Sequence, residues 1–260
     1  MNALVDRTVA PTQPTRGALV AEIWLVLGVS LGASALFAFL DLLRSLTSGK
    51  ALSGQTAVIN GSAAHNQVLN LAYQLAGIAV ALVPVALVAY LLYRSGESLR
   101  DIGLDLERPG RELAWGAGLA AVIGGIGLGL YLAAYHAGLN VRVVPTSLPA
   151  TWWRIPVLVL SAFENALLEE VVVCGYLLHR LDQLDWPENR SLLTSATLRG
   201  AYHLYQGFGG FLGNFAMGLV FGRLYQRQRR LLRLVIAHGL IDTVAFVGYV
   251  LLHGHVSWLP

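Results

Sequence analysis

The amino-acid sequence predicts an all-α polytopic membrane protein, a helical bundle with about seven transmembrane helices. Of its 260 residues 55% are hydrophobic and 13% are charged, and the mean hydropathy is +0.59. Soluble domains carry about 25% charged residues, so most of this chain must face lipid or other apolar helices. Long apolar segments recur along the whole chain, which favours one helical bundle over separate soluble domains.

The individual helices follow from segment length, because a spanning helix needs about 20 mainly apolar residues. Four segments meet that length: 18–43, 67–92, 113–138 and 155–178. Two shorter ones, 191–206 and 211–226, flank a glycine-rich turn, and a full-length segment follows at 231–252. Residues 1–17 lack the apolar stretch of a secretory signal. We therefore expect a disordered cytoplasmic tail over 1–17 and a transmembrane bundle over 18–252.

Orientation follows from the basic residues, which are enriched in short cytoplasmic loops. With alternating helices, the side of the N-terminus holds Arg7, Arg16, Arg94, Arg100, Arg108, Arg111, Arg180, Arg190, Arg223, Arg227, Arg229, Arg230 and Arg233. The opposite side holds Arg44, Lys50, Arg142 and Arg154. This contrast predicts a cytoplasmic N-terminus. In so hydrophobic a chain, the basic balance indicates contact with the lipid bilayer and not with nucleic acid.

Polar side chains at membrane depth are concentrated after residue 160. Ionisable groups there cost about 2.5 to 3.5 kcal/mol each to insert, so they usually face the bundle interior and serve a function. The set comprises Glu164, Asn165, Glu169 and Glu170 on one segment, Arg199 and His203 on the next, and His238 and Asp242 on the last. Because this set comes from three segments, we expect a convergent polar cluster.

Two other interpretations of this cluster need no catalysis. Polar residues in membrane helices often only hydrogen-bond one helix to another, although each member of so large a set adds its own insertion cost. A proton-coupled transporter would also use intramembrane carboxylates and histidines, but it would be expected to have broken helices in two related halves. Here the polar residues lie in one half of the chain, which disfavours transport.

Three motifs in this region resemble those of the CAAX-protease and bacteriocin-processing family, also called Abi-type intramembrane proteases. They are the Glu169-Glu170 pair followed by Gly175-Tyr176, then His203, then His238 with Asp242 four residues later. Their order and spacing agree with the family pattern, and the resemblance covers about residues 113–250.

The sequence departs from the family pattern at two positions. Cys174 stands where the family has arginine, and Arg199 stands where it has phenylalanine. We expect Arg199 to supply the missing guanidinium by pairing with Glu170, since arginine suits a bidentate contact with a carboxylate. The missing arginine is also the best argument for an alternative, a catalytically inactive family member that acts as a membrane scaffold.

The resemblance implies an intramembrane endopeptidase that acts on a membrane-associated peptide or protein. Glu169, helped by His203, would activate a water molecule as general base. His238 and Asp242 would hold the developing oxyanion, with Asp242 fixing the histidine tautomer or itself donating. The expected catalytic set is Glu169, Glu170, His203, His238 and Asp242, with Arg199, Asn165 and Cys174 in support.

No cofactor is favoured, because the chain lacks the His-Glu-x-x-His spacing of membrane zinc proteases. The family has been described both as glutamate-dependent and as zinc-dependent. If zinc is bound, its ligands would be Glu169, His203 and His238.

We expect an integral protein of a bacterial plasma membrane.

Overall fold

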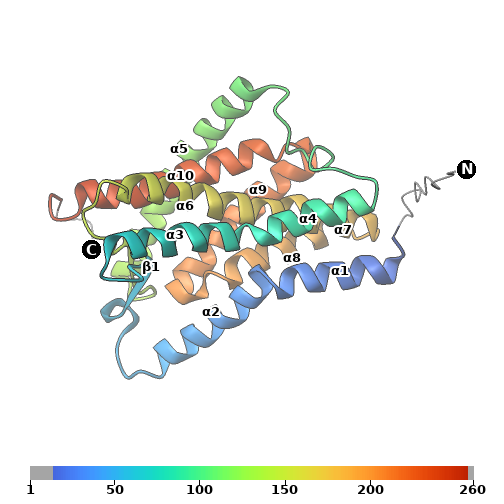
Figure 1. Cartoon of the computed structure of the whole chain (residues 1–260). Coiled ribbons are helices and arrows are strands. Elements are labelled where there is room, and N and C mark those ends of the chain that lie inside the picture. Colours follow the sequence, from blue (N-terminus) through green and yellow to red (C-terminus); the bar gives the residue numbers. More distant parts are fainter. Residues whose placement is uncertain (1–13, 257–260) are drawn as a thin grey trace, which may run out of the picture.

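The computed structural model describes residues 14–256, which form a bundle of helices with one two-stranded sheet (Figure 1). The predicted helical class is therefore confirmed. The α-helices are α1 (Arg16–Gly28), α2 (Leu31–Leu46), α3 (Gln67–Ala81), α4 (Val83–Arg94), α5 (Pro109–His136), α6 (Arg154–Glu169), α7 (Leu178–Gln183), α8 (Glu188–Ala201), α9 (Phe208–Gln228) and α10 (Leu232–Leu252). Of the predicted tail, residues 1–13 lie outside the described residues, and α1 begins at Arg16.

The first predicted span is bent by 49° where α1 meets α2. Gly28 and Ser30 lie at this break, and the Ser30 amide donates to the Leu27 carbonyl, three residues back instead of four. The Ser30 hydroxyl donates to the Val26 carbonyl. Glycine and serine together are a common cause of sharp helix kinks. As a result, α2 slants away from α3 in Figure 1.

The second predicted span is also interrupted, between α3 and α4. Leu82 separates the two helices, and Pro84 lies in the first turn of α4. Proline is tolerated in a first turn, because its missing N–H would have no intrahelical partner there. Together the two helices form one 28-residue apolar span, Gln67–Arg94.

The predicted number of about seven transmembrane helices is not confirmed. Within residues 14–256, three helices are long and apolar enough to cross a membrane: Gln67–Arg94, Pro109–His136 and Leu232–Leu252. The bent pair α1 and α2 could make a fourth. The segments that fall short include α6 and α8, which have 16 and 14 residues. These same short helices carry Glu164, Asn165, Glu169 and Arg199 of the polar cluster.

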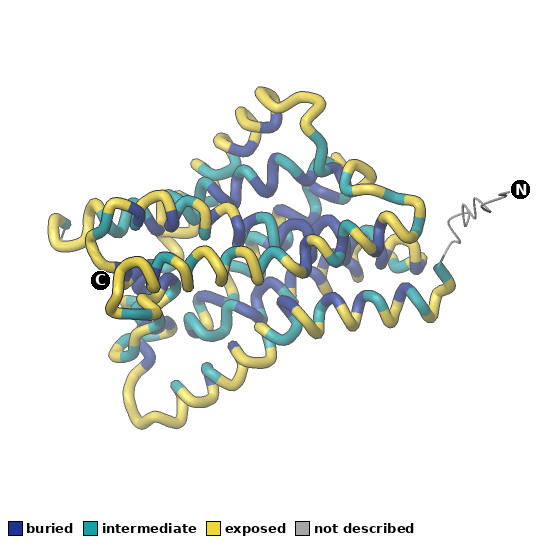
Figure 2. Tube along the Cα trace, viewed as in Figure 1, coloured by how far each residue is buried: buried dark blue, intermediate teal, exposed yellow. Residues whose placement is uncertain are grey.

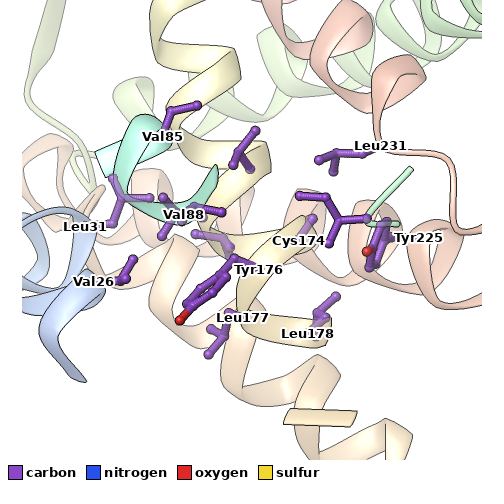
Figure 3. Packing of buried hydrophobic residues seen from close by; sticks show 14 of the residues in the cluster. Val26, Leu31, Val85, Val88, Cys174, Tyr176, Leu177, Leu178, Tyr225 and Leu231 are labelled. Carbon is purple, nitrogen blue, oxygen red and sulfur yellow. The ribbon is translucent and has the colours of Figure 1, made fainter. Parts of the chain in front are cut away.

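One element interrupts the expected helix over residues 155–178. After Glu169 the chain continues as a π-helix, η2 (Glu170–Leu177), in which every residue is buried. Figure 3 shows Tyr176 and Leu177 of η2 beside Val26 and Val88, so this element packs at the centre of the largest apolar cluster. Figure 2 shows the contrast with the yellow, exposed turns of the outer helices, whose apolar side chains are suited to face acyl chains.

A small parallel sheet joins two loops at one end of the bundle, and the helical fold prediction did not include it. Strand β1 (Thr56–Asn60) pairs with β2 (Arg142–Thr146), with Thr56 opposite Arg142. Each strand has five residues, too short for their pattern to stand out beside the helical segments. The sheet ties the α2–α3 loop to the α5–α6 loop.

A buried arginine ties α7 to the loop between α4 and α5. The Arg180 side chain is fully buried, and its guanidinium donates to the Glu97 carboxylate at 2.6 Å and to the Ser95 hydroxyl at 2.9 Å. His179 also hydrogen-bonds to Glu97. Glu97 is therefore an anchor for α7.

Candidate active site

The polar cluster forms where α6, η2, α8 and α10 meet. Helix α10 packs along α6, and α8 contacts η2. Glu169 is the last residue of α6 and Glu170 is the first of η2, so the α-to-π transition falls between the two carboxylates. π-helical turns are rare and often lie at functional sites, because the extra residue in the turn re-aims the side chains that follow.

Arg199 of α8 contacts both carboxylates. Its Nη2 lies 2.7 Å from Glu170 Oε1, and its Nη1 lies 3.4 Å from Glu169 Oε2. The structure thus contains the expected pair of Arg199 with Glu170, but the expected bidentate geometry is wrong. Glu170 Oε2 has no hydrogen-bond partner among the described residues. The guanidinium bridges the two carboxylates, and the Cys174 Sγ lies 3.9 Å from Nη2.

Glu169 has different partners on its two oxygens. Its Oε2 accepts a hydrogen bond of 2.7 Å from the Tyr202 hydroxyl, besides the longer contact with Arg199. Its Oε1 faces His203 Nε2 at 4.0 Å. The carboxylate therefore has one oxygen held by donors of α8 and one oxygen directed at an imidazole.

His203 has a fixed tautomer. Its Nδ1 lies 2.9 Å from the main-chain carbonyl of Arg199, and a carbonyl oxygen can only accept, so Nδ1 carries the proton. In the neutral ring, Nε2 is then an acceptor. Two acceptors, this Nε2 and Glu169 Oε1, face each other 4.0 Å apart. That separation suits a water molecule that donates one hydrogen to each.

His238 of α10 is oriented by Glu170. Its Nδ1 lies 2.8 Å from Glu170 Oε1, whereas Asp242 Oδ2 is 3.7 Å from Nε2. Asp242 was expected either to fix the tautomer or itself to donate, but the short hydrogen bond to the ring comes from Glu170. His238 Nε2 lies 4.0 Å from Glu169 Oε2 and so points toward the first carboxylate.

The remaining polar residues of α6 border the same region. Asn165 lies beside Asp242. Glu164 is buried, and its Oε1 has no hydrogen-bond partner among residues 14–256. The structure therefore brings all eight predicted site residues and Glu164 to one cluster, and it adds Tyr202. The position of Tyr202 directly before His203, three residues after Arg199, was the available signal.

The residues of the alternative zinc set do not fit a preformed metal site. Each imidazole Nε2 lies 4.0 Å from the nearer oxygen of Glu169. Zinc holds ligands at about 2.0 to 2.2 Å, so two ligand atoms on one tetrahedral ion lie roughly 3.3 to 3.6 Å apart. Arg199 and Tyr202 also occupy Oε2 of Glu169. Within the described part of the chain, no group of three or more His, Cys, Asp or Glu side chains could hold a metal ion.

Two grooves lead toward the cluster. The first, about 690 Å³, lies where both outer spans are interrupted, and apart from Ser30, Ser34 and Asp41 its wall is apolar. It is lined by Val29, Ser30, Ala33, Ser34, Phe37, Ala38 and Asp41 on one side, by Val80, Ala81, Val83 and Pro84 on the other, and by Leu168, Tyr202 and Tyr205. The second groove, about 780 Å³, is more polar and runs from Tyr205 past Asp41, Arg44 and Lys50 to β1.

The fold and the cluster define a class: a helical membrane protein with a buried site of carboxylates and imidazoles next to a largely apolar groove. Residues 151–244 match the family model of the type II CAAX prenyl endopeptidase Rce1-like proteins. This match confirms the resemblance to the CAAX-protease family over the segment that carries the whole cluster. It implies a protease, and with the apolar helices it indicates an integral membrane protein. No curated protein and no solved structure matches the chain.

Proposed function

We propose that this chain is an intramembrane endopeptidase that hydrolyses peptide bonds of a membrane-associated protein or peptide. The observation that carries the proposal is the pair of acceptors, Glu169 Oε1 and His203 Nε2, 4.0 Å apart. A water molecule between them donates both hydrogens, so its lone pairs point away from the two bases. That is the orientation needed to attack a carbonyl carbon.

In the proposed reaction, the water oxygen forms a bond to the scissile carbonyl carbon while Glu169 takes one of its protons. His203 holds the other hydrogen and orients the nucleophile. The carbon–nitrogen bond then breaks, and Glu169 returns its proton to the leaving amine. General-base assistance of this kind contributes a factor of about 10² to 10⁴ in rate. No covalent intermediate is needed.

The oxyanion would be held by His238. Glu170 accepts from Nδ1 of this ring, so Nε2 donates to the oxyanion when both ring nitrogens carry a proton. In this mechanism Glu169 and His203 act on the water molecule. His238, oriented by Glu170, acts on the carbonyl oxygen.

A serine nucleophile is not supported by the contacts of the two serines in this region. The Ser161 hydroxyl donates to Asn60 Oδ1 at 2.9 Å, and the Ser195 hydroxyl donates to the Val173 carbonyl at 3.1 Å. Neither serine hydrogen-bonds to a histidine that could activate it. Activated water is therefore the favoured nucleophile.

The groove that ends at Tyr202 supports a substrate that arrives from the bilayer. Its mainly apolar wall would accept the hydrophobic part of a peptide or of its membrane anchor. We also propose that α6, α8 and α9 complete a bundle of about seven membrane segments, with the N-terminus in the cytoplasm of a bacterium, as the distribution of arginine favours.

A catalytically inactive scaffold is the second candidate. It is favoured by Cys174 at the position of the family arginine, and by the contact of Arg199 with the proposed base Glu169 at 3.4 Å. A scaffold would retain the fold of the cluster without hydrolysing any peptide. Proton-coupled transport has no comparable support.

The deciding experiment is a cleavage assay of the purified protein in detergent against a peptide library. We expect the wild type to cleave, Glu169→Gln and His203→Ala to lose activity, and Glu188→Gln, a change at an exposed position, to keep it. Activity should persist with a zinc chelator. Cleavage that survives Glu169→Gln would contradict the proposal. Cleavage abolished by the chelator and restored by zinc would overturn the metal-free mechanism.

A further inference from the structure

Tyr202 holds the oxygen of Glu169 that does not face His203. Its hydroxyl donates to Glu169 Oε2 at 2.7 Å, and its side chain is 5% exposed. A hydrogen bond from a neutral donor to a carboxylate is stronger than one between neutral groups. Tyr202 therefore restrains the rotation of this carboxyl group.

The donors on Oε2 decide which oxygen of Glu169 can act as base. Tyr202 and Arg199 both occupy Oε2, at 2.7 Å and 3.4 Å, whereas Oε1 has no hydrogen-bond donor among the described residues. Only Oε1 is then free for a water molecule, on the side of His203. Without the phenol, the carboxyl group could rotate, and the pairing of one oxygen with His203 would be lost.

Tyr202 also links the site to the groove. It is one of the residues that line the 690 Å³ groove, and its hydroxyl contacts Glu169, which does not line the groove.

We propose that Tyr202 is a positioning residue that fixes Glu169 with Oε1 directed at His203. The proposal rests on the proposed function of the cluster as a hydrolytic site. It is independent of the metal question and of the nature of the substrate.

Tyr225 of α9 provides a matched control away from the site. It is buried, and its hydroxyl donates to the main-chain carbonyl of Gly175 at 3.3 Å. It lines neither groove. Tyr225→Phe therefore removes a buried tyrosine hydroxyl without removing a hydrogen bond from the base.

The kinetic test compares both variants on a peptide that the wild type cleaves. In Tyr202→Phe we expect kcat to fall by about 10- to 100-fold, the effect of losing one hydrogen bond to a charged group, with KM close to wild type. Tyr225→Phe should keep kcat within about twofold. An unchanged kcat in Tyr202→Phe, or an equal fall in both variants, overturns the proposal.

A second measurement does not depend on activity. The loss of stability caused by Tyr202→Phe is compared in the wild-type background and in a Glu169→Ala background, by denaturant unfolding. If the hydroxyl holds the carboxylate, the loss should be clearly smaller where the carboxylate is absent. Equal losses in the two backgrounds overturn the proposal. If the losses differ but no protein form cleaves any peptide, the contact stands and the hydrolytic function fails.

Discussion

Arg199 Nη2 lies 2.7 Å from Glu170 Oε1, and both side chains are fully shielded from solvent. The pair joins α8 to η2 inside the bundle. Glu170 passes the link on to α10, because the same oxygen accepts from His238 Nδ1. Through this pair and the contact of Arg199 with Glu169, α8 is connected to η2, α10 and α6.

The first prediction concerns the removal of this guanidinium. Arg199→Ala leaves the carboxylate of Glu170 buried without its charged partner, and breaking a buried pair in this way costs about 3 to 5 kcal/mol. We expect a clearly lower unfolding free energy in a denaturant titration. Arg223→Ala removes the arginine from an exposed pair with Glu188 and should cost about 1 kcal/mol or less. Equal losses in the two variants would contradict a structural role for the buried pair.

A second prediction concerns moving the arginine from position 199 to position 174, where the family has it. In the double variant Cys174→Arg with Arg199→Phe, a guanidinium at 174 starts from η2, one turn after Glu170. We expect the double variant to be more stable than Arg199→Phe alone, so the two changes should be non-additive. Thermal unfolding of both single variants and the double variant measures this coupling. Additive losses would show that position 174 cannot supply the charge.

A third prediction concerns pH and the anchor of α7 outside the site. Burial alone would raise the pKa of Glu97, but the hydrogen bond and charge of His179, together with Arg180, outweigh it and hold the pKa below its usual value of 4.5. A depressed pKa means that this carboxylate stabilises the fold above about pH 4.5. The contribution is lost as the pH falls through the lower, folded-state value.

Glu97→Gln should therefore be less stable than wild type at pH 7, by about 1 to 3 kcal/mol. The gap should narrow as the pH falls below 4.5 and close below the lower, folded-state pKa, where the wild-type carboxyl group is protonated as well. Thermal melts from pH 2 to pH 7 test this. Glu107→Gln, an exposed change in the same loop, should show a small gap at every pH. A gap for Glu97→Gln that persists at the lowest pH would count against the ionic anchor.

Much of the site could be predicted from the sequence, because buried charge is so costly in a membrane that it must converge. Glu169, His203 and His238 come from three distant segments, and their residue types alone indicated a common pocket. The partner of Arg199 was also predictable, since a carboxylate was the obvious counter-charge for a buried guanidinium. What the residue types could not provide was the sharing of that guanidinium between two carboxylates.

The details that escaped prediction depend on backbone geometry. The π-helical turn after Glu169 changes which residues share a face, so the division of partners between Tyr202 and His238 does not follow from ideal helical spacing. The number of spans is not confirmed by helix length and composition, because the segments 155–178 and 191–206 contain charged residues and form short helices. The β1–β2 sheet depends on contacts between loops that are distant in sequence.

The last prediction separates the two residues of the third motif. His238 is hydrogen-bonded through Nδ1 to Glu170, so His238→Ala removes the proposed oxyanion donor and should lower kcat by about 10² to 10³. Asp242 lies farther away, 3.7 Å from the other ring nitrogen, and does not orient the ring. Asp242→Asn should therefore keep kcat within about tenfold of wild type. The comparison uses the peptide identified in the library assay. A loss in Asp242→Asn as large as that in His238→Ala would mean that the aspartate, and not Glu170, controls the imidazole.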